Sequence, residues 1–400
     1  MECPRPRLTA TTARRVLTTL AVVFAVLVTS GWLHRNEPPE PGSFAAQLLA
    51  WQHDEITGVS LPEPGAGAAE ISAFFASMGH RKQLLLAERH PLVVGNLNGA
   101  PVEVRYRANR HALADARAHE VARGLDPRLS PSGRHEAARL VHRFDSLLAE
   151  DRQILAFDPT GRGRVAEVFG DLTEARRISV VVPGVDTDLL TFERSHLKYR
   201  APVGMARALH HQQRKAAPER RTAVIAWADY SAPHGVGVSA ATEGLAQEGG
   251  RRLRDTVSGL PPDATVALFC HSYGSVVCGV AASSLPDRVT DIAVAGSPGM
   301  RGSHASRLGT DARIWAARAA DDWIGDVPHL AVGPLGHGED PAAPAFGALP
   351  VSSDDVTGHG GYFVPGTDSL EGFARIGAGL VARAGWDGDG PYCVPGGPRV

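Results

Sequence analysis

The strongest chemical signal in the sequence is a serine at the junction of two apolar runs. Thr265 to Cys270 has the composition of a buried strand, and the small residues from Val276 to Leu285 predict a helix. Between them stands His271-Ser272-Tyr273-Gly274-Ser275. A serine at such a sharp strand-to-helix turn exposes its hydroxyl, and the helix N-terminus favours developing negative charge. The pattern predicts that Ser272 is a nucleophile.

One position departs from the usual Gly-x-Ser-x-Gly form of this turn. The first glycine is replaced by Cys270, which is small enough to keep the turn feasible. Two other interpretations stand beside the nucleophile. In the first, Ser272 caps the helix and has no catalytic role. In the second, Cys270 is the nucleophile, which is disfavoured because its side chain should point away from the tip of the turn.

The acid partner is expected after the serine, because this arrangement has the chain order Ser, acid, His. No carboxylate follows the expected strand Ile292–Ala295, whereas several follow the strand Ile314–Ala317. Asp322 is the preferred acid. Asp321 and Asp326 are the alternatives, as is an ordinary solvated loop aspartate.

The histidine is expected further along the chain, in a loop. His359 lies in Thr357-Gly358-His359-Gly360-Gly361-Tyr362, a glycine-lined loop before a helical stretch that starts near Ser369. His337 and His329 compete with it, and a loop histidine without a catalytic role is common. Order and context favour His359.

Acyl chemistry also needs two backbone donors for the oxyanion. The amide of Tyr273 stands next to the nucleophile. The second is expected from the loop that begins Pro183-Gly184-Val185, where Gly184 permits close approach and the amide of Val185 is the donor. The alternative is an ordinary turn at the end of a strand.

Strands alternate with helices in the second part of the chain, which predicts βαβ units and a mostly parallel sheet. A turn at 158–161 predicts an opening hairpin. The expected strands are Gln153–Phe157, Val165–Phe169, Ile178–Val182, Ala223–Trp227, Thr265–Cys270, Ile292–Ala295 and Ile314–Ala317. We therefore expect an α/β domain over residues 151–400. Residues 36–150 have helical patterning, with helices expected at 106–122 and 132–148, and form an accessory region.

The first 35 residues predict a targeting or anchoring segment. Arginines precede an uncharged stretch from Val16 to Leu33, which resembles a secretory signal and is also about long enough for a minimal membrane span. A cleaved signal and an uncleaved anchor remain equally open, and a buried soluble helix is the third possibility. Either of the first two predicts an extracytoplasmic protein, secreted or anchored to the cell membrane.

Composition and motifs exclude several function classes. The 400 residues carry a formal net charge of −2, so no basic excess indicates nucleic acid as a partner. We find no His-Glu-x-x-His, Cys-x-x-Cys, phosphate-binding loop or dinucleotide fingerprint, and expect neither metal nor cofactor. Of the four cysteines, Cys270 and Cys278 are interpreted as small buried apolar residues and not as a disulfide.

The sequence resembles a group of actinobacterial α/β-hydrolase-fold proteins, largely of unknown function. The resemblance covers roughly residues 80–375. The segments that carry it are Pro91–Gly99, Ala108-Asn109-Arg110, Val181–Val185, His271–Ser275, Gly296–Gly299, His337-Gly338 and Gly358-His359. It implies an α/β-hydrolase fold and supports Ser272, Asp322 and His359 as site residues. It implies no substrate.

These observations predict a serine hydrolase, most simply an esterase or lipase acting on a small-molecule or lipid ester. A peptidase or amidase with the same three residues is the alternative among enzymes. A non-catalytic envelope protein that has kept the fold is the alternative outside them, because fold does not imply function.

Overall fold

The computed structural model describes residues 43–56, 58–333 and 335–381. The predicted segment 1–35 lies outside them. Within the described residues, no helix has the length and apolarity needed to cross a membrane.

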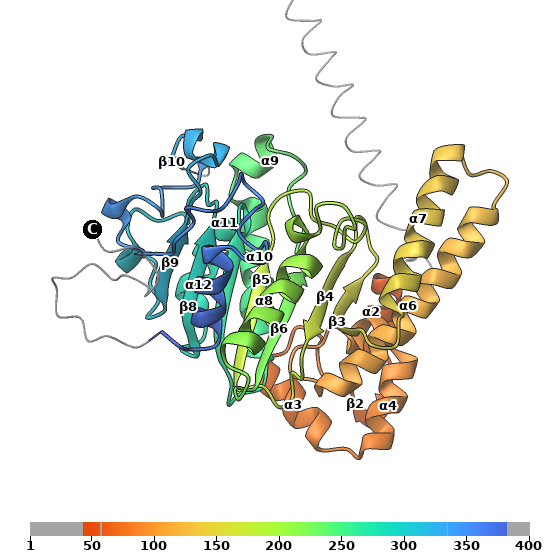
Figure 1. The fold of residues 1–400 in the computed structure, drawn as a ribbon. Helices are drawn as coiled ribbons and strands as arrows, with labels where there is room; N and C mark the ends of the chain where they lie inside the picture. The colour runs from red at the N-terminus through yellow and green to blue at the C-terminus, as the bar shows by residue number, and fades with distance from the viewer. Residues whose placement is uncertain (1–42, 57, 334, 382–400) are drawn as a thin grey trace, which may run out of the picture.

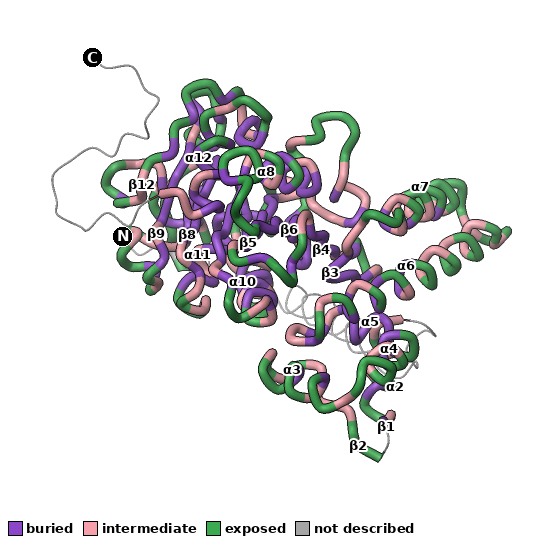
Figure 2. The backbone as a smooth tube through the Cα atoms, turned by 60° about the horizontal axis from the view of Figure 1, so that its bottom comes forward, coloured by how far each residue is buried: buried purple, intermediate pink, exposed green. Residues whose placement is uncertain are grey.

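The described part of the chain begins with helices, as the patterning within residues 36–150 predicts. The helices are α2 (Phe44–Gln52), α3 (Ala68–Ala76), α4 (His80–Arg89), α5 (Pro91–Val94), α6 (Val102–Leu125) and α7 (Pro131–Leu147). A two-residue hairpin that the sequence analysis did not predict, β1 (Glu55–Ile56) with β2 (Val59–Ser60), interrupts them. α6 and α7 run side by side and extend away from the sheet (Figure 1), and their far ends are mostly exposed (Figure 2).

The second part of the chain builds one eight-stranded sheet. Its strands are β3 (Gln153–Asp158), β4 (Arg164–Phe169), β5 (Arg177–Val182), β6 (Thr222–Ala228), β7 (Thr265–His271), β8 (Val289–Ala295), β9 (Arg313–Ala317) and β12 (Leu349–Pro350). The order across the sheet is β12-β9-β8-β7-β5-β6-β4-β3. All seven strands expected from the sequence are present, and β12 is an addition at the edge.

The sheet opens with antiparallel strands and continues in parallel. β3 pairs with β4, and β4 with β6, in the antiparallel sense. β5, β6, β7, β8, β9 and β12 then pair in parallel. The strands are buried along almost their whole length because helices cover both faces. Parallel pairing brings the carboxyl ends of β5 to β9 to one edge of the sheet.

Two helices pack on each face. α10 (Gly244–Ser258) and α11 (Gly274–Ala281) share an apolar cluster with one face of the central strands. α8 (Pro202–Ala216) and α12 (Asp368–Gly377) share a second cluster with the other face. At the carboxyl edge lie the short helix α9 (Val238–Ala241) and the hairpin of β10 (Ala331–Val332) with β11 (Leu335–Gly336), seen in Figure 1 at one end of the molecule.

The helical region covers the edge of the sheet at β3 through two side-chain amides. Asn96 donates to the carbonyl of Phe157 (2.7 Å) and accepts from its amide (3.2 Å). Asn109 donates to the carbonyl of Ile154 (2.9 Å) and to that of Gly95 (3.1 Å). An unpaired edge strand is a liability for aggregation, and these amides use the backbone groups that β3 leaves unpaired.

Candidate active site

Ser272 lies at the turn between β7 and α11. Its backbone has φ 54°, in the left-handed region that non-glycine residues rarely adopt. The turn is tight: a Cβ added to Gly274 would lie 2.3 Å from the carbonyl oxygen of Val182. Only glycine fits at position 274. The tight turn therefore explains both the glycine that follows Tyr273 and the strained backbone at Ser272.

The structure brings the three predicted residues into one hydrogen-bonded row. His359 Nε2 lies 2.9 Å from Ser272 Oγ. On the other side of the ring, His359 Nδ1 lies 2.9 and 3.1 Å from the two carboxylate oxygens of Asp322. The residues come from the turn after β7, the loop after β9 and the loop before α12. Three separate carboxyl-edge loops therefore meet at one point.

The Asp322 carboxylate is buried but well provided with donors. Burial alone raises its pKa, whereas the hydrogen bonds from His359, from the Tyr362 hydroxyl (2.5 Å) and from the Ile324 amide (2.9 Å) lower it. The net effect holds the pKa of Asp322 below its ordinary value. The carboxylate is thus kept charged beside the imidazole, as an acid that stabilises an imidazolium must be.

Tyr362 is a site residue that the sequence analysis missed. Its hydroxyl donates to Asp322 and accepts from the amide of Ala319 at 3.0 Å. Burial, followed by the hydrogen bond to Asp322, raises the pKa of Tyr362. Its only signal in the sequence was its place at the end of the glycine-lined loop that carries His359.

His271 is a second missed residue. The ring is buried, and its Nε2 lies 2.7 Å from the carbonyl oxygen of His359. Burial, and then the proximity of His359, lowers the pKa of His271 to about 4. His271 is therefore neutral at neutral pH and donates its Nε2 proton to that carbonyl, which holds the His359 backbone in place.

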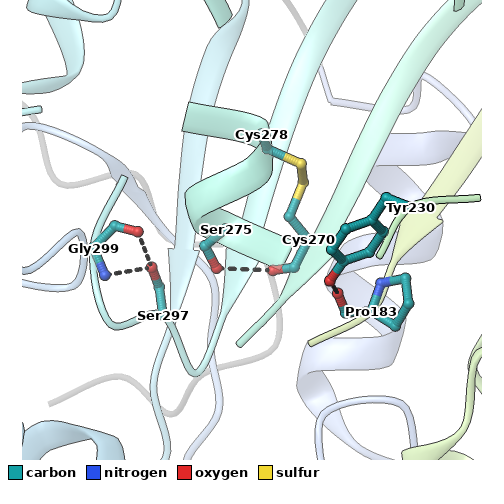
Figure 3. Close-up of a disulfide and its surroundings, with 7 residues drawn as sticks. All are labelled: Pro183, Tyr230, Cys270, Ser275, Cys278, Ser297 and Gly299. Carbon is teal, nitrogen blue, oxygen red and sulfur yellow. Dashed lines mark hydrogen bonds between the residues drawn. A yellow bond between two sulfur atoms is a disulfide. The ribbon is translucent and has the colours of Figure 1, made fainter. Parts of the chain in front are cut away.

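The loop after β5 lies directly against the serine. A Cβ added to Gly184 would lie 2.6 Å from Ser272 Cβ, so glycine is required for this approach. The hydroxyl of Tyr230 donates to the carbonyl of Pro183 at 2.6 Å and steadies the turn (Figure 3). Within the described residues, neither the Tyr273 amide nor the Val185 amide donates a hydrogen bond. Their role as oxyanion donors stays a prediction.

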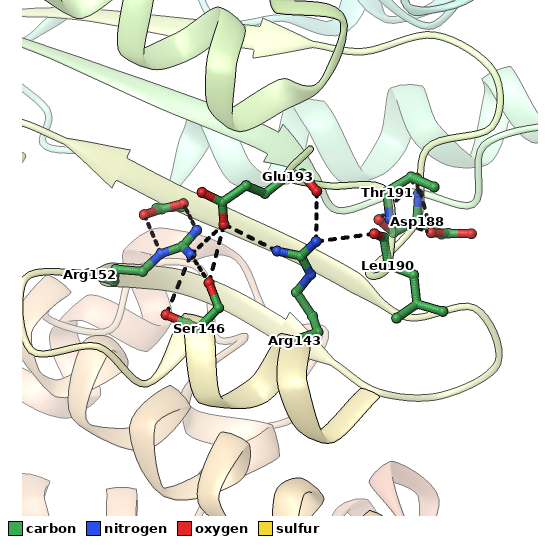
Figure 4. A network of polar contacts seen from close by, with 8 residues as sticks. Arg143, Ser146, Arg152, Asp188, Leu190, Thr191 and Glu193 are labelled. Carbon is green, nitrogen blue, oxygen red and sulfur yellow. Dashed lines mark hydrogen bonds and ion pairs between the residues drawn. The ribbon is translucent and has the colours of Figure 1, made fainter. Parts of the chain in front are cut away.

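Arg143 of α7 holds the far end of the same loop. Its guanidinium donates to the carbonyls of Leu190 (3.2 Å) and Glu193 (2.7 Å) and pairs with the Glu193 carboxylate (3.1 Å). Arg152 meets that carboxylate from the other side at 2.7 Å (Figure 4). The helical region therefore holds the loop that reaches Ser272.

The interpretation of Cys270 and Cys278 as unpaired was wrong. The two form a disulfide that joins the end of β7 to α11 (Figure 3). When Cys3 in the predicted targeting segment is set aside, three cysteines remain. This odd number argues against a complete disulfide framework but does not exclude a single pair. The turn brings two residues eight positions apart within reach, and the local pattern did not reveal this geometry. Both were correctly expected to be buried.

The competing candidates lie around the site without joining the row. Asp321 accepts from the amide of Gly358 at 2.8 Å and so supports the histidine loop. Asp326 is exposed. His337 is buried with its ring edge-on to Tyr273, and His329 hydrogen-bonds to the carbonyl of Pro298. None of the four hydrogen-bonds to Ser272 or to the His359 ring.

The part of the chain that the structure describes contains no candidate metal site. No three His, Cys, Asp or Glu side chains there are grouped to hold an ion. The polar groups that converge at the site are a hydroxyl, an imidazole and a carboxylate, which suit proton transfer and nucleophilic attack.

Curated mycobacterial proteins resemble much of this chain. The uncharacterized protein Rv2079 of Mycobacterium tuberculosis H37Rv is 27% identical over 383 residues, covering 80% of this chain and 57% of its own length. The uncharacterized protein Mb0988c of Mycobacterium bovis is 29% identical over 195 residues, covering 47% of this chain and 67% of its own length. The chain thus spans little more than half the length of the longer relative.

Solved structures show a weaker likeness. A serine hydrolase described as lacking a lid, XC6422 from Xanthomonas campestris, has a TM-score of 0.34 at 17% identity and covers 59% of this chain and 97% of its own. The 2,6-dihydroxy-pseudo-oxynicotine hydrolase has a TM-score of 0.38 at 11% identity and covers 83% and 93%. These values are too low to say anything about chemistry.

A family model described as alpha/beta hydrolase matches residues 158–332. The match begins at the end of β3 and runs through the turn that carries Ser272 to the loop that carries Asp322. The sheet order and the serine turn agree with this match, and together they show an α/β-hydrolase fold for this part of the chain.

Proposed function

We propose that this domain is a serine hydrolase that cleaves carboxylic esters through an acyl-enzyme. The observation that carries the proposal is the position of His359, whose two ring nitrogens hydrogen-bond to Ser272 and Asp322. A scaffold protein without catalysis has no need for this row or for the strained backbone at the serine.

The proposed reaction begins with attack of Ser272 Oγ on the ester carbonyl carbon. The Ser272 proton passes to His359 Nε2, and Asp322 stabilises the imidazolium. The amides of Tyr273 and Val185 hold the oxyanion. The carbon–oxygen bond to the leaving group then breaks, and His359 protonates the departing alkoxide.

Water completes the proposed cycle. His359 takes a proton from water as it attacks the acyl carbon, and the second tetrahedral intermediate collapses to release the carboxylic acid. The proton returns to Ser272 Oγ. Peptides and amides are cleaved by the same steps when the leaving group is an amine, so the geometry supports a peptidase or amidase as well.

A fluorophosphonate probe tests for an activated serine. We expect the parent to be labelled, Ser272→Ala to stay unlabelled, and Ser275→Ala to be labelled as the parent is. Ser275 is a matched control because it is a buried serine in the same turn whose hydroxyl faces the carbonyl of Cys270. A folded parent without label refutes the hydrolase and favours a binding protein. Parallel ester and amide panels then separate the two classes of substrate.

We also propose an extracytoplasmic location, secreted or membrane-anchored. The buried disulfide supports it, because disulfides persist mainly in oxidising compartments. The apolar segment within residues 1–35 supports it independently. A reporter that is active only after export, fused behind the chain, should be active with residues 1–35 present and inactive without them. Activity in neither fusion refutes the location.

A further inference from the structure

Large apolar side chains are exposed around the loops that carry the site. Among the described residues, twelve such side chains are exposed, and five of them lie beyond the carboxyl ends of β6 and β9. The five are Val236, Val238, Trp323, Leu330 and Leu335, with exposed fractions from 46% to 79%. We call them the apolar rim. Figure 1 shows α9 and β10, which belong to these loops, at the same end of the molecule.

Trp323 connects the rim to the site. It follows Asp322 directly, and its ring centre lies 4.9 Å from that of His359. Almost half of the side chain is nevertheless in contact with solvent. The exposed indole therefore lies against the imidazole that the proposed mechanism uses.

Val236 and Val238 are attached to the other side of the site. Their loop is pinned to Asp186, whose amide donates to the carbonyl of Pro233 (2.9 Å) and whose carboxylate accepts from the amide of Gly235 (2.9 Å). Asp186 follows Val185, the proposed oxyanion donor. The two exposed valines thus stand on a loop fixed to the oxyanion loop.

Leu335 is attached from a third direction. It forms a β-bridge with Thr242, and the carbonyl of Thr242 accepts from the hydroxyl of Tyr273 at 3.1 Å. Arg301 binds the carbonyl of Gly336 at 2.6 Å and pairs with Glu243 at 2.6 Å. The hairpin is therefore held beside the residue that follows the nucleophile.

The charge pattern indicates what the rim contacts. His234 and Asp186 face each other at 2.7 Å, and Arg301 and Glu243 are paired as well. Arg301 is thus matched by Glu243, whereas Asp186 faces a histidine. The exposed Asp321 and Asp326, which lie near Trp323, form no ion pair among the described residues. An exposed apolar patch of this kind marks an interaction site. Exposed carboxylates without a cation repel an acidic surface, so the pattern favours an uncharged apolar surface over an acidic one.

We propose that the apolar rim docks on the surface of lipid aggregates and that the substrate is a water-insoluble lipid ester taken from that surface. The proposal rests on the proposed esterase function. Burial of five such side chains at about 25 cal/mol per Å² supplies a favourable contribution to docking. Three attachments to site elements ensure that docking brings Ser272 to the interface.

The first test compares an emulsified ester with a dissolved one, using the full chain throughout. The readout is the ratio of the rate on emulsified tributyrin to the rate on dissolved p-nitrophenyl acetate. We expect Val236→Ser/Val238→Ser/Leu335→Ser to lower this ratio at least tenfold. Leu125→Ser should leave it unchanged, because Leu125 is just as exposed but lies at the end of α6. A ratio that falls no further than in the control overturns the proposal.

The second test does not depend on catalysis. Vesicles of brominated phosphatidylcholine should quench the tryptophan fluorescence of the parent, and part of this quench should disappear in Trp323→Phe. The rest of the chain is the same in both proteins, so the difference reports contact of Trp323 with lipid. Equal quenching overturns the rim proposal, whether the true occupant is a protein or nothing. A parent that is unlabelled by fluorophosphonate and inactive on dissolved ester refutes the esterase instead, and the quench still decides the rim.

Discussion

At the residue scale, the charge on Asp322 depends on the neighbours that donate to it. The Tyr362 hydroxyl is the closest of them, and the carboxylate is buried. We expect Tyr362→Phe to lower kcat/KM about tenfold, because a hydrogen bond to a charged group is worth roughly 1.5–3 kcal/mol. The pKa of Asp322 should rise when this donor is removed. Activity should then be lost at a higher pH on the acid side of the profile.

A pH–rate profile checks the Tyr362 prediction. Tyr199→Phe is the control, because within the described residues its hydroxyl has no hydrogen-bond partner. A higher substrate concentration should restore neither the rate of Tyr362→Phe nor its pH profile, because Tyr362 does not reach the reacting atoms. An unchanged acid limb in Tyr362→Phe contradicts the positioning role.

His271 makes stability depend on pH. Its pKa is about 4 in the folded protein and about 6.5 when unfolded. Below pH 6.5 the unfolded chain therefore binds a proton that the folded protein excludes, so stability is lost as pH falls. Between pH 7.5 and pH 5 we expect this residue to lower the free energy of unfolding by about 2 kcal/mol.

Urea unfolding at the two pH values measures this loss. The comparison is with His271→Gln, whose amide can still donate to the His359 carbonyl but does not titrate. Between pH 7.5 and pH 5, the free energy of unfolding of the variant should fall by about 2 kcal/mol less than that of the parent. Parallel pH dependence in the two proteins would show that His271 is not the titrating group.

At the element scale, the loop from Gly184 to Glu193 has its two ends on different parts of the molecule. One end lies against Ser272, and the other is held by Arg143 of α7. A helix outside the sheet therefore positions backbone that the proposed mechanism uses for the oxyanion. Loops that carry site residues need such support when the sheet ends beneath them.

Removal of Arg143 should weaken this support. We expect Arg143→Ala to lower kcat about tenfold with a smaller change in KM, because the oxyanion is bound mainly in the transition state. Arg139→Ala is the control, since Arg139 lies one turn away on α7, is exposed and has no partner among the described residues. Steady-state kinetics on a dissolved ester measure both. Equal effects of the two variants would assign the loss to charge alone.

At the scale of the whole molecule, the helical region and the sheet share one apolar core. Phe144 and Leu147 of α7 and Leu113 of α6 belong to the same cluster as Phe157 and Val165 of the sheet. The amide of Asn109 crosses the same boundary to reach β3. Such a shared core favours one cooperative transition over two.

We expect a single unfolding transition for the parent in calorimetry. Asn109→Leu should keep it single while lowering the free energy of unfolding by about 1–3 kcal/mol, because it leaves the Ile154 carbonyl buried without its donor. Gln52→Leu on α2 is the control, because Gln52 is an exposed polar position. Two separate transitions in the parent would contradict the shared core.

The sequence by itself determined the parts of this protein that depend on local pattern. Strands β3 to β9 appear in it as apolar runs between turns, because a strand covered on both faces needs such a run. The positions of Ser272, Asp322 and His359 were predicted from chain order and loop context, and the structure brings them together. Their catalytic roles remain the proposal tested above.

Only the tertiary structure decided which distant groups meet. The contact of His271 with His359 spans 88 positions and that of Tyr362 with Asp322 spans 40. The hydrogen bond from Arg143 to the carbonyl of Glu193 spans 50 positions. The burial of one face of a strand or helix repeats with a regular period along the sequence. Hydrogen bonds and ion pairs between distant residues have no such period, so no pattern of residues predicts them. The pairing of Cys270 with Cys278 is short in sequence, but it depends on the turn that folds α11 back on β7. The two sulfurs come close enough to bond only when this turn has formed.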